Sequence, residues 1–331
     1  MDISATLDSL PRLRLCQLPT PIQRMRRLEQ ALGAADGPAL YVKRDDLTGL
    51  AFGGNKGRKL EFCLAEAQQQ DADTVLTCGG VQSNHCRQTA VAATALGFEA
   101  HLFLRGERPE KLTGNLLPSA LCGAEMHFVG KDQPVSHGQA MAEFAEKLRS
   151  QGRRPYVIPT GASNTTGAMG YVQAAREIKA QQDEMGVEFD WIVTATGSTG
   201  TQAGLLAGAK LFGLTGRVIG MAVSPTSDVD ARRAGIATFA TETAQCLGAD
   251  APTSPDEVIF AADYAGEGYA IATEAGQAAL ELAARMEGLF LDPTYTAKAM
   301  AGLIDHVRRG EFAASDRVLF VHTGGTIAIF A

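Results

Sequence analysis

A lysine that directly follows a glycine-rich turn is the first candidate for chemistry in this 331-residue sequence. Lys56 comes after Gly53-Gly54-Asn55, where glycine lets the backbone approach a ligand closely. A lysine desolvated beside such a turn becomes a nucleophile, because burial disfavours its charged form. A solvated basic turn is the alternative, since lysine is usually exposed. The competing amine, Lys59, is expected at the surface of the helix that follows.

The second candidate is a polar run after two glycines. Gly79-Gly80 precede Gln82, Ser83, Asn84 and His85, and a helical pattern begins there. Free backbone N–H groups at a helix start favour an anion such as a carboxylate. A simple helix cap formed by Ser83 or Asn84 is equally compatible with the pattern, and a histidine at such a position is more often structural than a base.

The third candidate is the turn Thr196–Thr201, which is rich in glycine, serine and threonine and follows an apolar strand. Its amides and hydroxyls at a helix N-terminus suit a phosphate group. The turn lacks the Gly-Lys-Ser/Thr of a P-loop and the G-x-G-x-x-G spacing of a dinucleotide site. The pattern therefore favours a single phosphate, with a glycine turn that only permits close helix–strand packing as the alternative.

The elements that must position these residues follow an α/β pattern. Short β-branched runs alternate with longer segments of helical period almost from end to end, which predicts parallel strands with crossover helices. The expected strands are Ala39–Lys43, Thr74–Thr77, Ala100–Leu104, Glu125–Val129, Tyr156–Ile158, Trp191–Thr194, Val218–Val223 and Val318–His322. The expected helices are Leu60–Gln70, Asn84–Leu96, Ala140–Gln151, Gly167–Gln181, Thr201–Phe212, Ala275–Glu287 and Ala297–Arg308.

The length predicts two lobes, because single cores stop growing beyond about 250–300 residues. No Pro/Ser-rich linker separates two halves, so the chain must cross between the lobes, and we expect the crossings in the polar turns Thr48–Asn55 and Thr160–Thr166. We therefore expect residues 53–161 to form a small domain, and residues 1–52 with 162–331 to form a discontinuous large domain.

Composition excludes several classes of function. With 30 basic and 37 acidic residues and no basic run, the chain lacks a nucleic-acid footprint. The six cysteines show no zinc-site spacing, which predicts no metal site and fits a reducing cytoplasm. Neither a signal peptide nor a stretch of about 18 apolar residues is present, so we expect no export and no membrane insertion.

Taken together, these segments resemble the fold type II (tryptophan synthase β-like) enzymes that depend on pyridoxal 5'-phosphate (PLP), in the branch of D-cysteine desulfhydrase and 1-aminocyclopropane-1-carboxylate (ACC) deaminase. The resemblance runs from about Leu18 to Phe330. It implies two parallel-sheet lobes with flanking helices, an active site between them, bound PLP, an amino-acid substrate and a homodimer. The motifs that carry it are K-R-D-D-x-T, G-G-N-K-x-R-K-L-E, Q-S-N-H-x-R-Q-T, G-A-M-G-Y-V, L-D-P-x-Y-T and H-T-G-G.

The resemblance also implies a role for individual residues. Lys56 corresponds to the Schiff-base lysine, Asn84 to a partner of the cofactor's ring oxygen, and Thr296 to the group facing the pyridine nitrogen. Tyr295 and Tyr269 match active-site tyrosines, Tyr295 assisting proton transfer. The substrate-carboxylate loop comprises Gln82, Ser83 and His85, with Ser83 also a catalytic candidate, and the phosphate and ring contacts comprise Thr196, Gly197, Ser198, Thr199, Gly200, Thr201 and Thr323.

Two threonines favour β-elimination over cyclopropane ring opening. In the cyclopropane deaminases of the family that this chain resembles, the residue corresponding to Thr296 looks like a glutamate and the residue corresponding to Thr323 looks like a leucine. A hydroxyl cannot supply the charge of a carboxylate to the pyridine nitrogen. The resemblance therefore implies D-cysteine desulfhydrase activity, giving pyruvate, ammonia and sulfide. L-cysteate sulfo-lyase activity, giving sulfite, is the first alternative; ACC deaminase and a non-catalytic amino-acid binder are the others.

Departures from the family pattern concern the leaving-group side of the pocket. Ala270 lies in a loop that has lost its usual glycine and Pro-Asn elements, and Ala297 replaces a usual glycine. A sulfonate would need a cationic or amide-rich pocket. Arg232 or Arg233 could supply the charge, although the pattern favours a solvated helix face for this pair.

Overall fold

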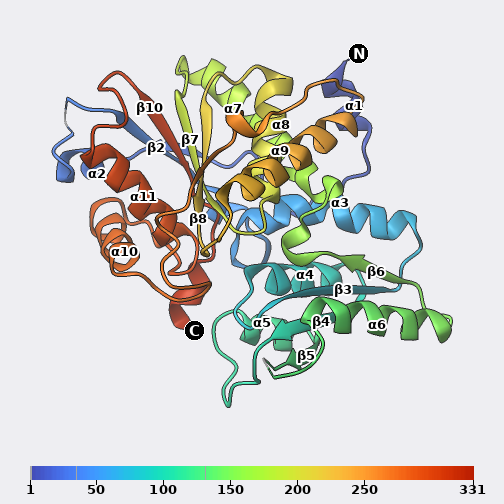
Figure 1. Cartoon of the computed structure of the whole chain (residues 1–331). Coiled ribbons are helices and arrows are strands. Elements are labelled where there is room, and N and C mark those ends of the chain that lie inside the picture. The colour runs from blue at the N-terminus through green and yellow to red at the C-terminus, as the bar shows by residue number, and fades with distance from the viewer. Residues whose placement is uncertain (1, 35, 131) are drawn as a thin grey trace.

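The computed structural model describes residues 2–34, 36–130 and 132–331, and within them the chain forms two β-sheets (Figure 1). The larger has the strand order β1 (Ile22–Arg24), β2 (Ala39–Lys43), β10 (Arg317–Val321), β7 (Trp191–Thr196), β8 (Arg217–Ala222) and β9 (Ile259–Ala261). The smaller has the order β5 (Glu125–Val129), β4 (Glu99–Arg105), β3 (Thr74–Gly80) and β6 (Pro155–Ile158). All paired strands run parallel except β1 with β2, which confirms the α/β prediction.

Helices cover both faces of the larger sheet, which is why its central strands are almost continuously apolar. In β10, Leu319 and Val321 face one core while Val318 and Phe320 face the other, as the two-residue period of a strand requires. The first core is shared with α1 (Ile3–Ser9), α7 (Thr165–Met185), α8 (Gly200–Phe212) and α9 (Val229–Gln245). The second is shared with α2 (Arg26–Ala31), α10 (Glu274–Glu287) and α11 (Thr296–Arg308).

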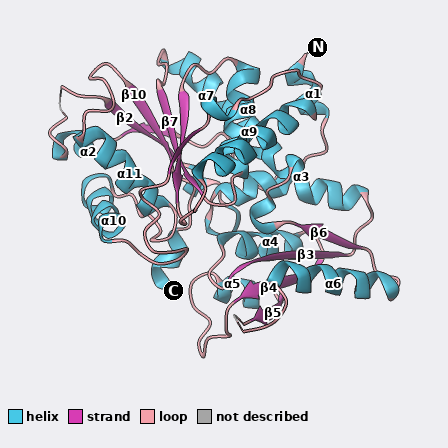
Figure 2. Ribbon diagram, in the orientation of Figure 1, coloured by secondary structure: helices cyan, strands magenta, loops and turns pink. Residues whose placement is uncertain are grey.

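The smaller sheet is also covered on both faces (Figure 2). One face packs against α3 (Asn55–Gln69), α4 (Asn84–Ala95) and α5 (Leu116–Leu121), and the other packs against α6 (His137–Ser150). Helix α3 also contacts α7, so it lies between the two sheets. The chain enters the smaller sheet after α3 and leaves it after β6, while the domain limits at residues 53 and 161 stay a prediction.

The eight expected strands are all present, with ends that differ by at most three residues from the expected ones. The elements that sequence reasoning missed are short or weakly patterned. β1 and β9 are three-residue edge strands, and α9 is rich in alanine and threonine with little amphipathic period. Within the described residues, no helix combines the length and apolar character needed to cross a membrane.

Candidate active site

A cavity of about 690 Å³ opens between the carboxyl ends of the two sheets. Ligands in parallel α/β sheets bind outside the carboxyl ends of strands, so this is the position that the topology favours. Of the predicted site residues, only Gly200 and Thr296 are absent from the lining. Those that line the cavity are Lys56, Gln82, Ser83, Asn84, His85, Thr196, Gly197, Ser198, Thr199, Thr201, Tyr269, Tyr295 and Thr323.

Lys56 is the second residue of α3, and its neighbour Asn55 ties the start of this helix to segments of the larger lobe. The Asn55 backbone N–H donates to the Thr323 carbonyl (3.0 Å), and its side-chain Nδ2 donates to Thr201 Oγ1 (3.0 Å). Burial lowers the pKa of Lys56 to about 8, although the negative charge of Asp292 opposes that shift. The amine is therefore far more available in its neutral, nucleophilic form than an ordinary lysine.

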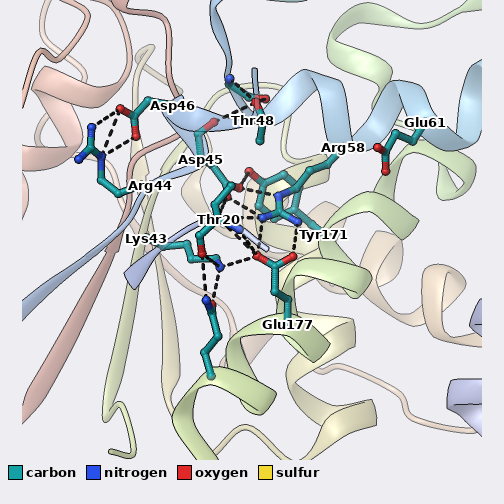
Figure 3. A network of polar contacts seen from close by, with 12 residues as sticks. Thr20, Lys43, Arg44, Asp45, Asp46, Thr48, Arg58, Glu61, Tyr171 and Glu177 are labelled. Carbon is teal, nitrogen blue, oxygen red and sulfur yellow. Dashed lines mark hydrogen bonds and ion pairs between the residues drawn. The ribbon is translucent and has the colours of Figure 1, made fainter. Parts of the chain in front are cut away.

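A buried ionic network anchors the start of α3, two residues after Lys56 (Figure 3). The Arg58 guanidinium donates to both oxygens of Asp45 (2.9 and 2.8 Å) and to both oxygens of Glu177 (2.9 and 2.9 Å). Desolvation disfavours the charged forms of these groups, but the opposite charges and hydrogen bonds of their partners outweigh it. The pKa values of the Asp45 and Glu177 carboxyl groups are therefore lowered, and the pKa of Arg58 is raised. Lys43 completes the network from β2 by contacting Glu177 at 2.5 Å. These contacts tie α3 to β2, to the segment after β2 and to α7.

The loop after β3 combines a helix cap with open polar groups. Ser83 is the N-cap of α4, and its Oγ accepts from the Cys86 backbone N–H (3.2 Å). The Gln82 side chain is held by the segment at residues 113–115: its Oε1 accepts from the Asn115 N–H (2.8 Å), and its Nε2 donates to the Thr113 carbonyl (3.2 Å). The cap expected at Ser83 is therefore present, and the side-chain amide of Gln82 is occupied by protein.

His85 contributes a neutral ring to the same wall. Its Nε2 lies 2.7 Å from Thr77 Oγ1, and the Thr77 hydroxyl donates its own proton to the Ile158 carbonyl (2.9 Å). Nε2 must therefore carry the ring proton, which leaves a lone pair on Nδ1. Nδ1 is buried without a partner among the described residues, and burial together with Lys56 lowers the pKa of His85 well below its usual value. Toward a ligand this ring offers a hydrogen-bond acceptor.

The turn between β7 and α8 has the geometry of an anion cradle. Thr199, the N-cap of α8, has a φ of +67°, a conformation that residues with a side chain rarely adopt. Ser198 Oγ accepts from Ser163 Oγ (2.8 Å), and a Cβ on Gly161 would lie 2.3 Å from Ser198 Oγ. The close approach of the loop at Gly161 places hydroxyls around the N-terminus of a 13-residue helix, where the helix dipole favours negative charge.

Lys59 corrects one expectation and reveals a residue that sequence reasoning missed. It is fully buried instead of exposed, and its Nζ donates to the Gly161 carbonyl (3.2 Å). A Cβ on Gly200 would lie 2.9 Å from this Nζ, so the amine borders the cradle. Burial and the nearby Lys56 lower the pKa of Lys59 well below its usual value, and no ion pair of Lys59 occurs among the described residues. A buried amine without a carboxylate partner fits a site for a bound anion such as the phosphate of PLP, because the negative charge of the anion would favour the protonated form of Lys59.

Two tyrosines close the cavity from the larger lobe. The Tyr269 and Tyr295 hydroxyls lie 2.5 Å apart, and their rings meet edge to face with centroids 5.8 Å apart. Burial raises the pKa of both phenols, so both stay protonated at neutral pH. The pair can therefore hold or pass a proton as a linked unit.

Asp292 is a second residue that sequence reasoning missed, and it fixes the two residues that follow Thr294. Its carboxylate accepts from the backbone N–H groups of Tyr295 (2.8 Å) and Thr296 (2.9 Å). The Thr296 hydroxyl donates to Asp292 Oδ1 (2.8 Å) and accepts from the Asp292 N–H (2.8 Å). Only the remaining lone pair of Thr296 Oγ1 is left for a cofactor. The Asp292 carboxylate also accepts from the Thr294 N–H (2.9 Å), so the Asp-Pro-x-Tyr-Thr segment is a turn in which an aspartate bonds the backbone that follows it, and that pattern is the local signal for this role.

Arg232 and Arg233 do not supply charge to the cavity, and the favoured interpretation of a helix face agrees better with the structure. Both lie on α9, neither lines the cavity, and Arg233 pairs with Asp230 (3.7 Å) on its own helix. The cavity wall contains two other basic side chains, Arg105 at the end of β4 and His137 at the start of α6. Chain topology brought them there, and nothing in their local sequence marks them.

The chain belongs to the family of pyridoxal-phosphate dependent enzymes, whose model matches residues 13–324. Over its full length it is 41% identical to a D-cysteine desulfhydrase of Yersinia enterocolitica, covering 98% of that protein. A D-cysteine desulfhydrase of Klebsiella pneumoniae is also 41% identical, over 98% of this chain and 97% of the relative. A crystal structure of an ACC deaminase homologue superimposes with a TM-score of 0.88 at 39% identity, covering 99% of this chain and 96% of the other. These findings confirm the predicted family, the PLP cofactor and the two-lobed fold.

Proposed function

We propose that this enzyme removes the β-substituent of a β-substituted alanine, with D-cysteine as its principal substrate and pyruvate, ammonia and sulfide as products. The observation that carries the proposal is a pair of buried amines, Lys56 on the cavity wall with a pKa of about 8 and Lys59 outside the cavity lining but beside Gly200 of the 196–201 turn. One suits covalent attachment of an aldehyde cofactor and the other suits its phosphate. The name of the 41% identical relatives supports D-cysteine as the substrate.

The residues of the cavity divide between holding PLP and holding the substrate. Lys56 would bond the cofactor, and Asn84 would face its ring oxygen. Thr296 and Thr323 would face its pyridine side, and Ser83 with the amides of its loop would bind the substrate carboxylate, with Gln82 and His85 beside it. The phosphate would be held by Lys59 together with Thr196, Gly197, Ser198, Thr199, Gly200 and Thr201.

Bound PLP withdraws electrons from the substrate's α-carbon and so stabilises the charge left there by proton removal. Lys56, once free as an amine, is the group placed to take the α-proton, because its lowered pKa lies near the working pH. Tyr295, linked to Tyr269 through their hydroxyls, would supply a proton to the departing sulfur. Cleavage of the Cβ–S bond and hydrolysis of the resulting enamine then give one pyruvate and one ammonia per sulfide.

A second candidate, L-cysteate with sulfite as leaving group, is supported by charge. Arg105 and His137 line the cavity, while no carboxylate lines it among the described residues. Burial and the charge of Arg105 lower the pKa of His137, so its ring is neutral at neutral pH and Arg105 carries the positive charge. A guanidinium on the cavity wall favours an anionic β-substituent.

The test is a substrate panel assayed with purified holoenzyme. D-cysteine, L-cysteine, L-cysteate, β-chloroalanine and ACC are compared for pyruvate, 2-oxobutyrate and leaving group. Fastest release of pyruvate and sulfide from D-cysteine supports the principal proposal, and fastest release of sulfite from L-cysteate selects the second. Fastest formation of 2-oxobutyrate from ACC would overturn both and the argument from Thr296 and Thr323.

We propose further that the chain works as a cytoplasmic homodimer of two-domain subunits divided as 1–52 with 162–331, and 53–161. Exposed Phe290 and Phe330 support a subunit contact, and their segments are joined by the hydrogen bond from Thr326 Oγ1 to the Phe290 carbonyl (3.0 Å). The six cysteines are all unpaired, which fits a reducing compartment. Sedimentation equilibrium tests the dimer directly.

A further inference from the structure

Strand pairing in the smaller sheet gathers two histidines and a glutamate on one face, outside the cavity already described. β4 and β5 pair in parallel, with His101 opposite Glu125 and Phe103 opposite His127. Because residues two apart on a strand share a face, all four side chains point to the side covered by α6. No zinc-like spacing along the chain marks these residues, because they come from two different strands.

The three potential ligand atoms are close enough to share one ion. His101 Nδ1 lies 3.0 Å from His127 Nε2 and 3.3 Å from Glu125 Oε2, and the three groups offer atoms that all lie within 4.8 Å of one another. Zinc–nitrogen bonds of about 2.0–2.1 Å at a tetrahedral angle separate two ligand nitrogens by roughly 3.3–3.4 Å. A shift of a few tenths of an ångström therefore converts the contact between the histidines into a pair of metal bonds.

A second carboxylate orients His101 as metal-binding histidines are commonly oriented. Glu99 Oε1 accepts from His101 Nε2 (2.9 Å), so Nε2 carries the proton and Nδ1 presents its lone pair toward His127. Glu99 is itself held by Arg153, which donates to its other oxygen (2.6 Å). Such carboxylate–histidine contacts fix the tautomer and ring orientation of metal ligands. This support would be superfluous in a simple pair of stacked rings.

The ring of His127 is also held in place, by stacking on Phe103 (centroids 4.5 Å apart, 13° between planes) and by Phe144 of α6 (5.0 Å). Glu125, with 62% of its side chain exposed, leaves the site open to water, which would complete the coordination. The site lies near the start of β4, whereas Arg105 at the end of that strand lines the catalytic cavity.

We propose that His101, His127 and Glu125 bind one Zn²⁺ ion, with Glu99 as the orienting partner. The ion joins β5, the edge strand of the smaller sheet, to β4 and so stabilises that lobe without entering the reaction.

The test is Zn²⁺ titration of chelator-treated holoenzyme by calorimetry, with Zn²⁺-dependent thermal stability as a second readout. His127→Phe removes a ligand but keeps an aromatic ring on Phe103, and Glu125→Gln changes an exposed ligand, so both variants should fold. His306→Phe is the matched control, because His306 also stacks on an aromatic ring and contacts one carboxylate, Glu311 (2.7 Å), without a second histidine.

The wild type and His306→Phe should each bind one Zn²⁺ per chain and gain thermal stability with it. His127→Phe should lose that binding event, and Glu125→Gln should weaken it. A further variant, Glu99→Gln, changes only the orienting partner and should weaken binding by about 10- to 100-fold. Equal Zn²⁺ binding by the wild type and His127→Phe would place the ion elsewhere, at the cofactor or a cysteine, and overturn the proposal. Absence of binding to the wild type would overturn it as well.

Discussion

Replacing Arg58 with methionine tests whether the buried network holds the helix that carries Lys56. Arg58 makes five hydrogen bonds from a fully buried position, four to Asp45 and Glu177 and one to Thr20 Oγ1 (3.1 Å). Removing one partner of a buried ion pair leaves uncompensated charge and costs about 3–5 kcal/mol. Since Lys43 still contacts Glu177, we expect about 3 kcal/mol of lost unfolding free energy at pH 7.

The pH dependence of this loss follows from the carboxyl groups. In the wild type both pKa values are lowered, so the network's stabilisation is present above the unfolded values of about 4 and is lost as the pH falls through the folded values. Without Arg58 the same two carboxyl groups take up protons at higher pH. The difference in unfolding free energy should therefore be largest near pH 7 and smaller near pH 5.

The assay is urea unfolding of the holoenzyme at fixed excess PLP, followed by circular dichroism and by the fluorescence of Trp191, the only tryptophan. Arg149→Met is the control, because Arg149 pairs with Glu146 on the exposed face of α6 and such pairs contribute about 0–1 kcal/mol. The affinity for PLP should also fall in the Arg58→Met variant, together with its unfolding free energy. A loss no larger than that of Arg149→Met would refute the role assigned to the network.

Three further predictions concern cofactor binding. The rate at which PLP reacts with the cofactor-free protein should rise with pH, with a midpoint near 8, because the neutral amine of Lys56 attacks the PLP aldehyde. A midpoint at the ordinary lysine value of 10.5 would contradict the lowered pKa. Lys59→Met should weaken PLP binding by about 10- to 100-fold, the value of a hydrogen bond to a charged group, as measured by fluorescence titration, and unchanged affinity would exclude Lys59 from the phosphate site. Gly200→Ala should also weaken PLP binding, since the new Cβ would lie 2.9 Å from Lys59 Nζ, whereas Gly235→Ala on α9, with no atom within 4 Å, should leave it unchanged. If Gly200→Ala, like Gly235→Ala, left PLP binding unchanged, the 196–201 turn would tolerate the added Cβ and the prediction would be wrong.

Much of the fold follows from local pattern. Buried parallel strands such as Arg317–Val321 are apolar runs bounded by polar turns, and helices such as α4 begin at a capping residue, Ser83. Both features depend on neighbours in sequence, so they are visible without coordinates. The family motifs indicated the cofactor and fifteen candidate site residues, and thirteen of these line the cavity.

What sequence reasoning missed depends on contacts between distant segments. Lys59 was expected in solvent because its neighbours are charged, but the helix face on which it lies is covered by residues 161–163 and the 196–201 turn. Arg105 and His137 reach the cavity only through the packing of β4 and α6. The pairing of His101 with His127 arises from strand register, which no spacing within either strand reveals.

The central claim is that Lys56 is the amine that bears PLP in a β-eliminating enzyme. The direct measurement is borohydride reduction of the holoenzyme, followed by proteolysis and mass spectrometry, with D-cysteine turnover assayed before and after reduction. The account predicts that the reduced cofactor is found on Lys56 alone and that sulfide and pyruvate release stops when it is fixed there. Cofactor found on Lys59 or another lysine, or D-cysteine turnover that survives in Lys56→Ala, would contradict it.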